Sequence, residues 1–139
     1  MITDIVELRP RYGEVDQMGY VYHANYVTYC HQARNELLRK LNMDEIKLEK
    51  NHIILPVISF EIIYKKPAHY DELITIKTTI KEMPKVRLSF EFEIKNKQNI
   101  LLSKAKSTVV FVDCKSRSPK NAPDFIQNIF KNKFKSVSR

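Results

Sequence analysis

Apolar and polar residues alternate along the chain in two rhythms, which separate predicted strands from predicted helices. From Val86 to Ile94 every second residue is apolar, the period of a strand with one buried face. Ile74–Ile80 and Leu102–Val112 indicate further long strands, and Ile53–Lys65 is β-branched and apolar. Short connections between these segments favour antiparallel neighbours. The pattern therefore predicts four long strands in the body of the chain.

A helical period occupies the segment from about His23 to Leu41. Apolar residues recur there at helical spacing without Gly or Pro, and Arg39 and Lys40 in the last turn complement the helix dipole. Ile5–Arg9 is predicted as a short strand before this helix.

A second helix is predicted at the C-terminal end, from about residue 122 to residue 134. Pro123 opens it, and its apolar residues share one face: Phe125, Ile126, Ile129, Phe130 and Phe134. Strand, long helix, four strands and a C-terminal helix together predict a two-layer α+β domain. Typical domains have about 100–150 residues, so we expect residues 1–139 to form one domain with its core over residues 5–114.

Composition narrows the class of protein. Hydrophobic residues make up 43% and charged residues 29%, which is ordinary for a globular chain and argues against disorder. Cys30 and Cys114 are too few for a secreted disulfide framework, and Met1–Pro10 lacks the apolar core of a signal peptide. Ile53–Phe60, the most apolar run, is too short to cross a bilayer. We expect a cytoplasmic protein without stable membrane insertion.

The formal net charge of +8 favours anionic partners such as nucleic acid, phosphorylated cofactors or a membrane surface. Its distribution is uneven. Residues 115–139 hold seven basic residues against Asp124, a net charge of +6, which leaves +2 for residues 1–114. The body of the chain is therefore nearly balanced.

One stretch is unusual for a chain that is 29% charged: Gln17 to Ala33 contains no Asp, Glu, Lys or Arg. Glu14 and Asp16 lie just before it, so an acidic loop leads into an aromatic, uncharged helix start. A helix start offers unpaired N–H groups that stabilise an anion, and a carboxylate beside them can act as base or nucleophile. On spacing alone, Asp16 as a simple turn or cap residue stays an open alternative.

The same residues resemble a known family. Residues Tyr12–Tyr26 follow the pattern Tyr-x-Glu-x-Asp, two residues, Gly, then Val-Tyr-His and Asn-Tyr. This pattern is similar to the signature of 4-hydroxybenzoyl-CoA thioesterase-like acyl-CoA thioesterases. Ala33–Glu36, Tyr64–Ala68 and Val109–Asp113 extend the likeness over about residues 5–120. The resemblance implies the hot-dog fold, in which an antiparallel five-stranded sheet wraps a long central helix.

The family resemblance also implies a reaction and a site. The reaction is hydrolysis of an acyl-CoA thioester to a carboxylic acid and CoA. Asp16 matches the catalytic carboxylate, a general base or nucleophile, and the His23 N–H matches the group that polarises the carbonyl. Substrate contacts are expected from seven residues: Gly19, Tyr22, Tyr26, Lys65, Lys66, Lys85 and Arg87. No metal or redox cofactor is implied, since CoA belongs to the substrate.

Other candidate residues have simpler interpretations. The remaining histidines show no ligand spacing, so a metal site is not expected. Cys30 is a poor nucleophile candidate beside His31, because adjacent helix residues point apart. Glu36 is expected to pair with Arg39 or Lys40, and Glu14 is expected to be a solvated loop carboxylate.

Two alternative functions stay open. Hot-dog hydratases and dehydratases pair a loop histidine with a helix acid, which His23 and Glu36 superficially match. The second alternative is a non-catalytic basic module binding RNA or anionic lipid through residues 122–135. We favour the thioesterase, with acyl-CoA as substrate, acyl carrier protein as a further acidic partner, and no nucleic acid. The family resemblance implies a homo-oligomer: a dimer of hot-dogs, assembled into a tetramer.

Overall fold

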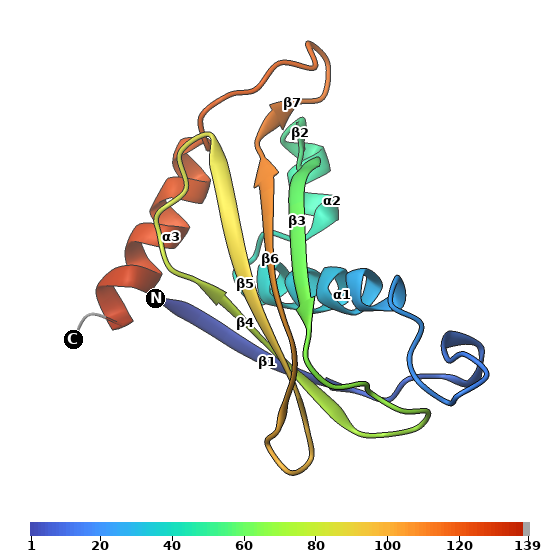
Figure 1. Cartoon of the computed structure of the whole chain (residues 1–139). Helices are drawn as coiled ribbons and strands as arrows, with labels where there is room; N and C mark the ends of the chain where they lie inside the picture. Colours follow the sequence, from blue (N-terminus) through green and yellow to red (C-terminus); the bar gives the residue numbers. More distant parts are fainter. Residues whose placement is uncertain (138–139) are drawn as a thin grey trace.

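The computed structural model describes residues 1–137, in which one five-stranded antiparallel sheet curves around a long helix (Figure 1). The strand order is β1-β4-β5-β6-β3. The strands are β1 (Ile2–Leu8), β3 (Val57–Tyr64), β4 (Ile74–Ile80), β5 (Arg87–Asn96) and β6 (Leu101–Val110); β2 (Ile53–Ile54) and β7 (Val112–Asp113) form a small second sheet. The predicted α+β architecture, with a long helix and an antiparallel sheet, is confirmed.

The helices are α1 (Asn25–Lys40), α2 (Glu45–Lys50) and α3 (Asp124–Val137). The start predicted for the long helix was wrong by two residues, because His23 and Ala24 form a turn before it. The sequence analysis missed α2, which has only six residues. Its N-cap, Asp44, accepts a hydrogen bond from the Lys47 N–H at 2.8 Å.

Two of the three antiparallel strand pairings expected from short connections are confirmed, and the third was wrong. β4 pairs with β5 and β5 pairs with β6, as their short links predict. β3 does not pair with β4; it pairs with β6 and forms an edge of the sheet. Residues 65–73 cross to β4 instead of turning back, because they hydrogen-bond to the loop before α1: the Val21 N–H donates to the Ala68 carbonyl at 2.9 Å.

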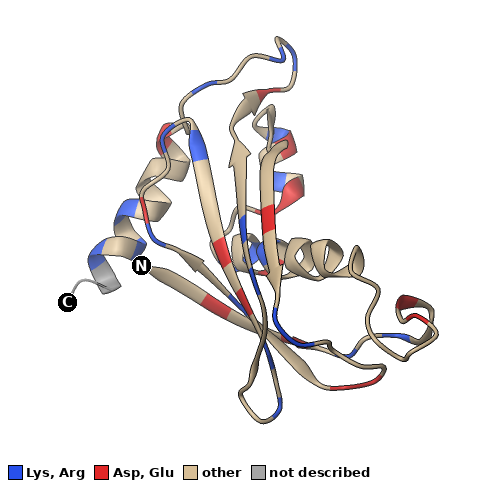
Figure 2. Cartoon of the chain, viewed as in Figure 1, with Lys and Arg blue, Asp and Glu red and all other residues tan. Residues whose placement is uncertain are grey.

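Alternation along β5 gives the sheet two unlike faces. Leu88, Phe90, Phe92 and Ile94 are buried in the core beneath the helices. The residues between them point to the opposite face, where Glu91 lies opposite Lys106 and other charges follow. The helices therefore cover one face and leave the other polar (Figure 2).

The C-terminal helix packs onto the body of the protein. Ile126 and Phe130 are fully buried in the common core, and the side-chain amide of Gln127 donates to the Pro84 carbonyl at 2.9 Å. Its lysines, Lys131, Lys133 and Lys135, are exposed. The apolar face of α3 is thus packed against the chain itself. Arg139, counted in the C-terminal charge, lies outside the described residues.

None of the helices within residues 1–137 has the length and apolar character needed to cross a membrane.

Candidate active site

The loop that carries Asp16 is a closed turn. The two ends of residues 15–21 pair as an isolated antiparallel bridge, and the Asp16 N–H donates to the Tyr20 carbonyl at 2.8 Å. Gly19 has φ 79°, a backbone region that favours glycine. Oδ1 of Asp16 accepts from the N–H groups of Met18 (2.9 Å) and Tyr20 (3.2 Å), which is an Asx turn. The turn thus orients an exposed carboxylate through its Oδ1 atom.

Glu14, two residues earlier, links this turn to α1 through hydrogen bonds. Its carbonyl accepts from the Tyr22 N–H and the Asn25 side-chain amide, both at 2.9 Å. Its carboxylate accepts from the Arg11 N–H at 2.7 Å and the Tyr29 hydroxyl at 2.8 Å. Only 19% of the side chain is exposed, so the expectation of a solvated carboxylate was wrong.

The ionisation of this pair follows from its contacts. Burial alone would raise the pKa of Glu14, but the hydrogen bonds from Arg11 and Tyr29, together with the charge of Arg11, lower it. Burial, and then the hydrogen bond to Glu14, raise the pKa of Tyr29. Glu14 is therefore held as a carboxylate and Tyr29 as a neutral donor.

The start of α1 lies next to the turn. Ala24 occupies the N-cap without a side-chain cap, and the Asn25 and Tyr26 N–H groups donate to the carbonyls of Tyr22 at 2.9 Å and His23 at 3.4 Å. Within residues 1–137 the His23 N–H has no acceptor, so it is open to an incoming one at the start of the helix. Just before it, the His23 carbonyl accepts from the Tyr64 hydroxyl at 3.0 Å. The His23 ring packs between Tyr22 and Tyr64, with ring centroids 4.5 and 6.4 Å away. An oriented carboxylate and an open backbone N–H donor at the helix start therefore share one loop, as thioester hydrolysis requires.

Comparison with known proteins agrees with this geometry. The sequence profile of the Thioesterase-like superfamily matches residues 10–130. The chain belongs to this thioesterase-like superfamily. YneP of Bacillus subtilis is 36% identical over 113 residues, 81% of this chain and 82% of that protein. The acyl-CoA thioester hydrolase YbgC of Escherichia coli O6:H1 is 34% identical over 124 residues, 89% and 92% of the two chains.

Solved structures support the fold. The DHNA-CoA thioesterase of Staphylococcus aureus superposes with a TM-score of 0.87 and 29% identity, over 99% of this chain and 92% of that chain. The fold of this thioesterase-like chain is the hot-dog fold expected from the resemblance.

The remaining aromatic candidates of this thioesterase-like chain divide into buried and exposed groups. Tyr26 is 2% exposed, and its hydroxyl accepts from the Ala68 N–H at 3.1 Å. Burial raises the pKa of Tyr26, so its hydroxyl stays neutral. Tyr22 is half exposed beside the open end of α1. Tyr64, which contacts both Tyr26 and His23, was not proposed as a site residue; only its place in the resembling segment Tyr64–Ala68 pointed to it.

The basic candidates lie at opposite ends of the sheet. Lys65 and Lys66 directly follow Tyr64, near the site, and donate their N–H groups to the Leu102 carbonyl at 2.8 and 3.0 Å. Lys85 and Arg87 lie at or just before the start of β5, beyond the C-terminal end of β4. They are about 20 Å along β4 from residues 68–70, which hydrogen-bond to the site loop. Within one subunit, the structure therefore does not bring Lys85 and Arg87 to Asp16.

The helix residues weighed as reactive groups have other partners. Glu36 pairs with Arg39, as expected, whereas Lys40 pairs with Asp4 of β1. Burial raises the pKa of Cys30 to about 12, which keeps it an unreactive thiol. Residues 1–137 contain no group of three or more His, Cys, Asp or Glu side chains that could hold a metal ion.

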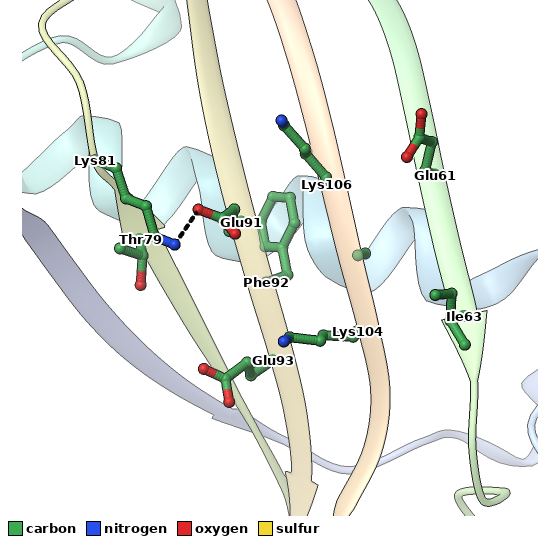
Figure 3. A pocket seen from close by; sticks show the side chains of 10 residues that line it. Glu61, Ile63, Thr79, Lys81, Glu91, Phe92, Glu93, Lys104 and Lys106 are labelled. Atoms are coloured by element: carbon green, nitrogen blue, oxygen red, sulfur yellow. Dashed lines mark ion pairs between the residues drawn. The ribbon is translucent and has the colours of Figure 1, made fainter.

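The uncovered face of the sheet carries a shallow hollow of about 320 Å³ (Figure 3). Its charges lie in cross-strand rows, such as Glu91 opposite Lys106 and Glu93 opposite Lys104. Lys81 pairs with Glu91 at 2.9 Å. None of the predicted site residues lines this hollow, and its charges largely neutralise one another.

Proposed function

We propose that the chain hydrolyses acyl-CoA thioesters to a carboxylic acid and free CoA. The observation that carries this proposal is the loop in which Asp16 is exposed and oriented near the start of α1, where the His23 N–H has no acceptor within residues 1–137. Thioester hydrolysis needs a group that activates water or attacks the carbonyl, and a donor for the oxyanion that forms. Membership of the thioesterase-like superfamily supports the same reaction.

The proposed mechanism uses one carboxylate and one backbone N–H. Asp16 either removes a proton from the attacking water, or attacks the carbonyl carbon itself to form a mixed anhydride that water hydrolyses after the thiolate has left. The carbonyl oxygen becomes an oxyanion that accepts from the His23 N–H, and its collapse expels the CoA thiolate. A fixed donor of this kind typically contributes about 3–4 kcal/mol to lowering the barrier. Every step uses the chain and water, so no metal or redox cofactor takes part.

The decisive experiment measures thiol release from acyl-CoAs of graded length and aromaticity. Asp16→Asn should lower kcat by about 10²–10⁴-fold, the usual contribution of a positioned base, while the thermal midpoint stays unchanged. The fold should survive because the Asn carbonyl can still accept the two turn hydrogen bonds. Asp71→Asn, at another exposed loop carboxylate, is the matched control and should keep wild-type activity. Full activity of a folded Asp16→Asn variant would refute the proposed site.

We further propose that two subunits pair through β3. This edge strand is apolar and uncovered: Val57, Ile58, Ile63 and Tyr64 are each 45% to 64% exposed. Long apolar edge strands favour pairing with another chain. The opposite edge, β1, is less apolar and carries the Asp4–Lys40 ion pair. Since β3 also holds Tyr64 against His23, this pairing would place the site at the subunit interface.

Lysine substitutions on β3 test this pairing. The double variant Ile58→Lys with Ile63→Lys should be monomeric in sedimentation or light-scattering measurements and should lose thioesterase activity. Ile5→Lys places a charge on the other edge, at a residue 59% exposed, and should leave assembly and activity intact. A β3 double variant that keeps the wild-type mass would contradict the β3 dimer.

Three finer points extend the proposal. We propose a tetramer made of two such dimers, which the same mass measurement tests. Acyl carrier protein thioesters are proposed as further substrates, because the net charge of +8 would attract an acidic carrier. We place the reaction in the cytoplasm, where free thiols such as Cys30 and Cys114 stay reduced.

A further inference from the structure

Arg34 is a buried charge whose hydrogen-bonding capacity is largely unused. It lies on α1 with 6% exposure, and its Nε–H has no acceptor within residues 1–137. One Nη2 hydrogen bond, to the Asn35 side-chain oxygen, is long at 3.4 Å. A guanidinium has five N–H donors, and leaving buried donors unpaired is costly. The side chain is therefore arranged for an acceptor that the single subunit does not supply.

A hollow of about 310 Å³ opens beside Arg34, between α1, α2 and β2. Its walls are mostly apolar, with Leu38, Leu48 and Ile54 among them, and Glu45 and Glu49 lie at its border. This volume is at the lower end for ligand pockets and suits a medium-length acyl group.

The polar groups of the hollow define what the end of such a ligand must carry. Arg34 can only donate hydrogen bonds, whereas Glu45 can only accept them when ionised. A hydroxyl group can do both, accepting from the guanidinium and donating to the carboxylate. A terminal carboxylate would be repelled, since Glu45 and Glu49 both line the hollow. The hollow therefore fits an apolar chain that ends in a hydroxyl.

The position of the hollow links it to the site of a second subunit. It adjoins residues 53–55, just before the N-terminal end of β3, whereas the open end of α1 contacts the other end of β3 through Tyr64. In one subunit the length of β3, about 27 Å, separates these two ends. Two β3 strands related by a twofold axis run antiparallel, so an axis near the middle of β3 would place each hollow beside the partner's site loop.

We infer that this hollow takes the far end of the acyl group bound at the partner subunit's active site, and that Arg34 is its specificity-determining donor. The inference rests on the proposed thioesterase activity and on the β3 dimer. It identifies the preferred substrate class as acyl-CoAs with a hydroxyl group at the distal end of a medium-length chain.

Substrates of matched length test the specificity. The wild-type dimer should prefer 8-hydroxyoctanoyl-CoA over octanoyl-CoA and over the carboxylate-ended suberyl-CoA. Arg34→Met should lower kcat/KM for the hydroxylated substrate by about 10–100-fold, the worth of a charged hydrogen bond. For butyryl-CoA, which is too short to reach the hollow, kcat/KM should stay within about twofold of the wild-type value. Arg39→Met, at an exposed arginine paired with Glu36, is the control and should change neither.

Mixed dimers test whether the hollow acts across the interface. If Asp16 of one subunit works with the partner subunit's Arg34, co-refolding Asp16→Asn with Arg34→Met regenerates one intact site per mixed dimer. Activity on 8-hydroxyoctanoyl-CoA should then reach about a quarter of the wild-type value at equal mixing. If both residues serve the same subunit, mixing adds no intact site.

Each outcome decides the inference. If Arg34→Met lowers kcat/KM equally for the hydroxylated, unsubstituted and carboxylate-ended chains, the inference is overturned. It is also overturned if the wild type shows no preference for the hydroxylated substrate, or if mixing the two variants recovers no activity. If Arg34→Met does not fold, Ile54→Phe, which fills the hollow, replaces it: a selective loss on the hydroxylated substrate supports the inference, and an unchanged rate overturns it. Failure of the wild type on every thioester would instead refute the proposed function.

Discussion

Two adjacent turns of one loop hold their carboxylates in opposite ways. In the turn over Tyr12–Glu14, the Glu14 carboxylate is mostly buried and accepts from Arg11 and Tyr29. In the following turn, the Asp16 carboxylate is exposed and is oriented only by N–H groups of its own turn. The first turn contacts the helix, and the second turn pairs with His69 and Tyr70.

This difference separates two roles that the sequence places two residues apart. Glu14 accepts four hydrogen bonds through its carbonyl and its carboxylate, and the two from Asn25 and Tyr29 fix the loop against α1. Asp16 is then free to react, because the loop does not depend on its charge for its position. A rigid support beneath a reactive group is what preorganised catalysis requires.

The largest expected contrast is in stability. Glu14→Ala removes the acceptor of the buried Tyr29 hydroxyl and should lower the free energy of unfolding by about 1–3 kcal/mol. Asp16→Asn should leave it within about 0.5 kcal/mol of wild type, as a surface substitution. Urea titrations of both variants measure the two values. Tyr29→Phe removes the donor as well, so in the Glu14→Ala background it should cost less than in wild type. Equal losses of unfolding free energy in Glu14→Ala and Asp16→Asn would contradict the proposed difference between the two turns.

A smaller effect is expected in the pH dependence of stability. The pKa of Glu14 is lowered in the folded chain, so its carboxylate stabilises the fold above the unfolded value of about 4.3. That stabilisation is lost as the pH falls from this value through the lower folded pKa. The difference in unfolding free energy between wild type and Glu14→Gln should therefore be greatest near neutral pH and shrink below about pH 4. Thermal melts across this range measure it, and a constant difference would contradict the assigned cause.

The same loop shows how far the sequence could predict the structure. Asp16 stood out because an uncharged aromatic stretch follows it. The role of Glu14 was missed because its partner Tyr29 lies fifteen residues further along and meets it only when the loop folds back on α1. A local pattern identifies the charged residue, but only the fold shows which charge is satisfied.

Prediction of the sheet from the sequence was limited in the same way. The alternation in β5 predicted its buried face correctly, since it reflects contacts within one strand. The place of β3 at the sheet edge could not be predicted, because a short connection fits both a hairpin and a crossover. Hydrogen bonds from residues 65–73 to the site loop decide for the crossover. Likewise α2 has six residues, four of them charged, too few for a helical period to stand out.

The smallest expected effect concerns Arg11 and shows what holds Glu14. The Arg11 side chain is 84% exposed, and its Nε lies 3.5 Å from the Glu14 carboxylate. Exposed ion pairs of this kind contribute at most about 1 kcal/mol and often nothing measurable. Arg11→Ala keeps the backbone N–H that donates to Glu14, so it should lower stability by less than about 0.5 kcal/mol, with little dependence on salt. Urea titrations at low and high ionic strength measure this. A large, salt-sensitive loss would show that charge fixes the first turn; the expected small loss assigns that role to the backbone of Arg11 and the hydroxyl of Tyr29.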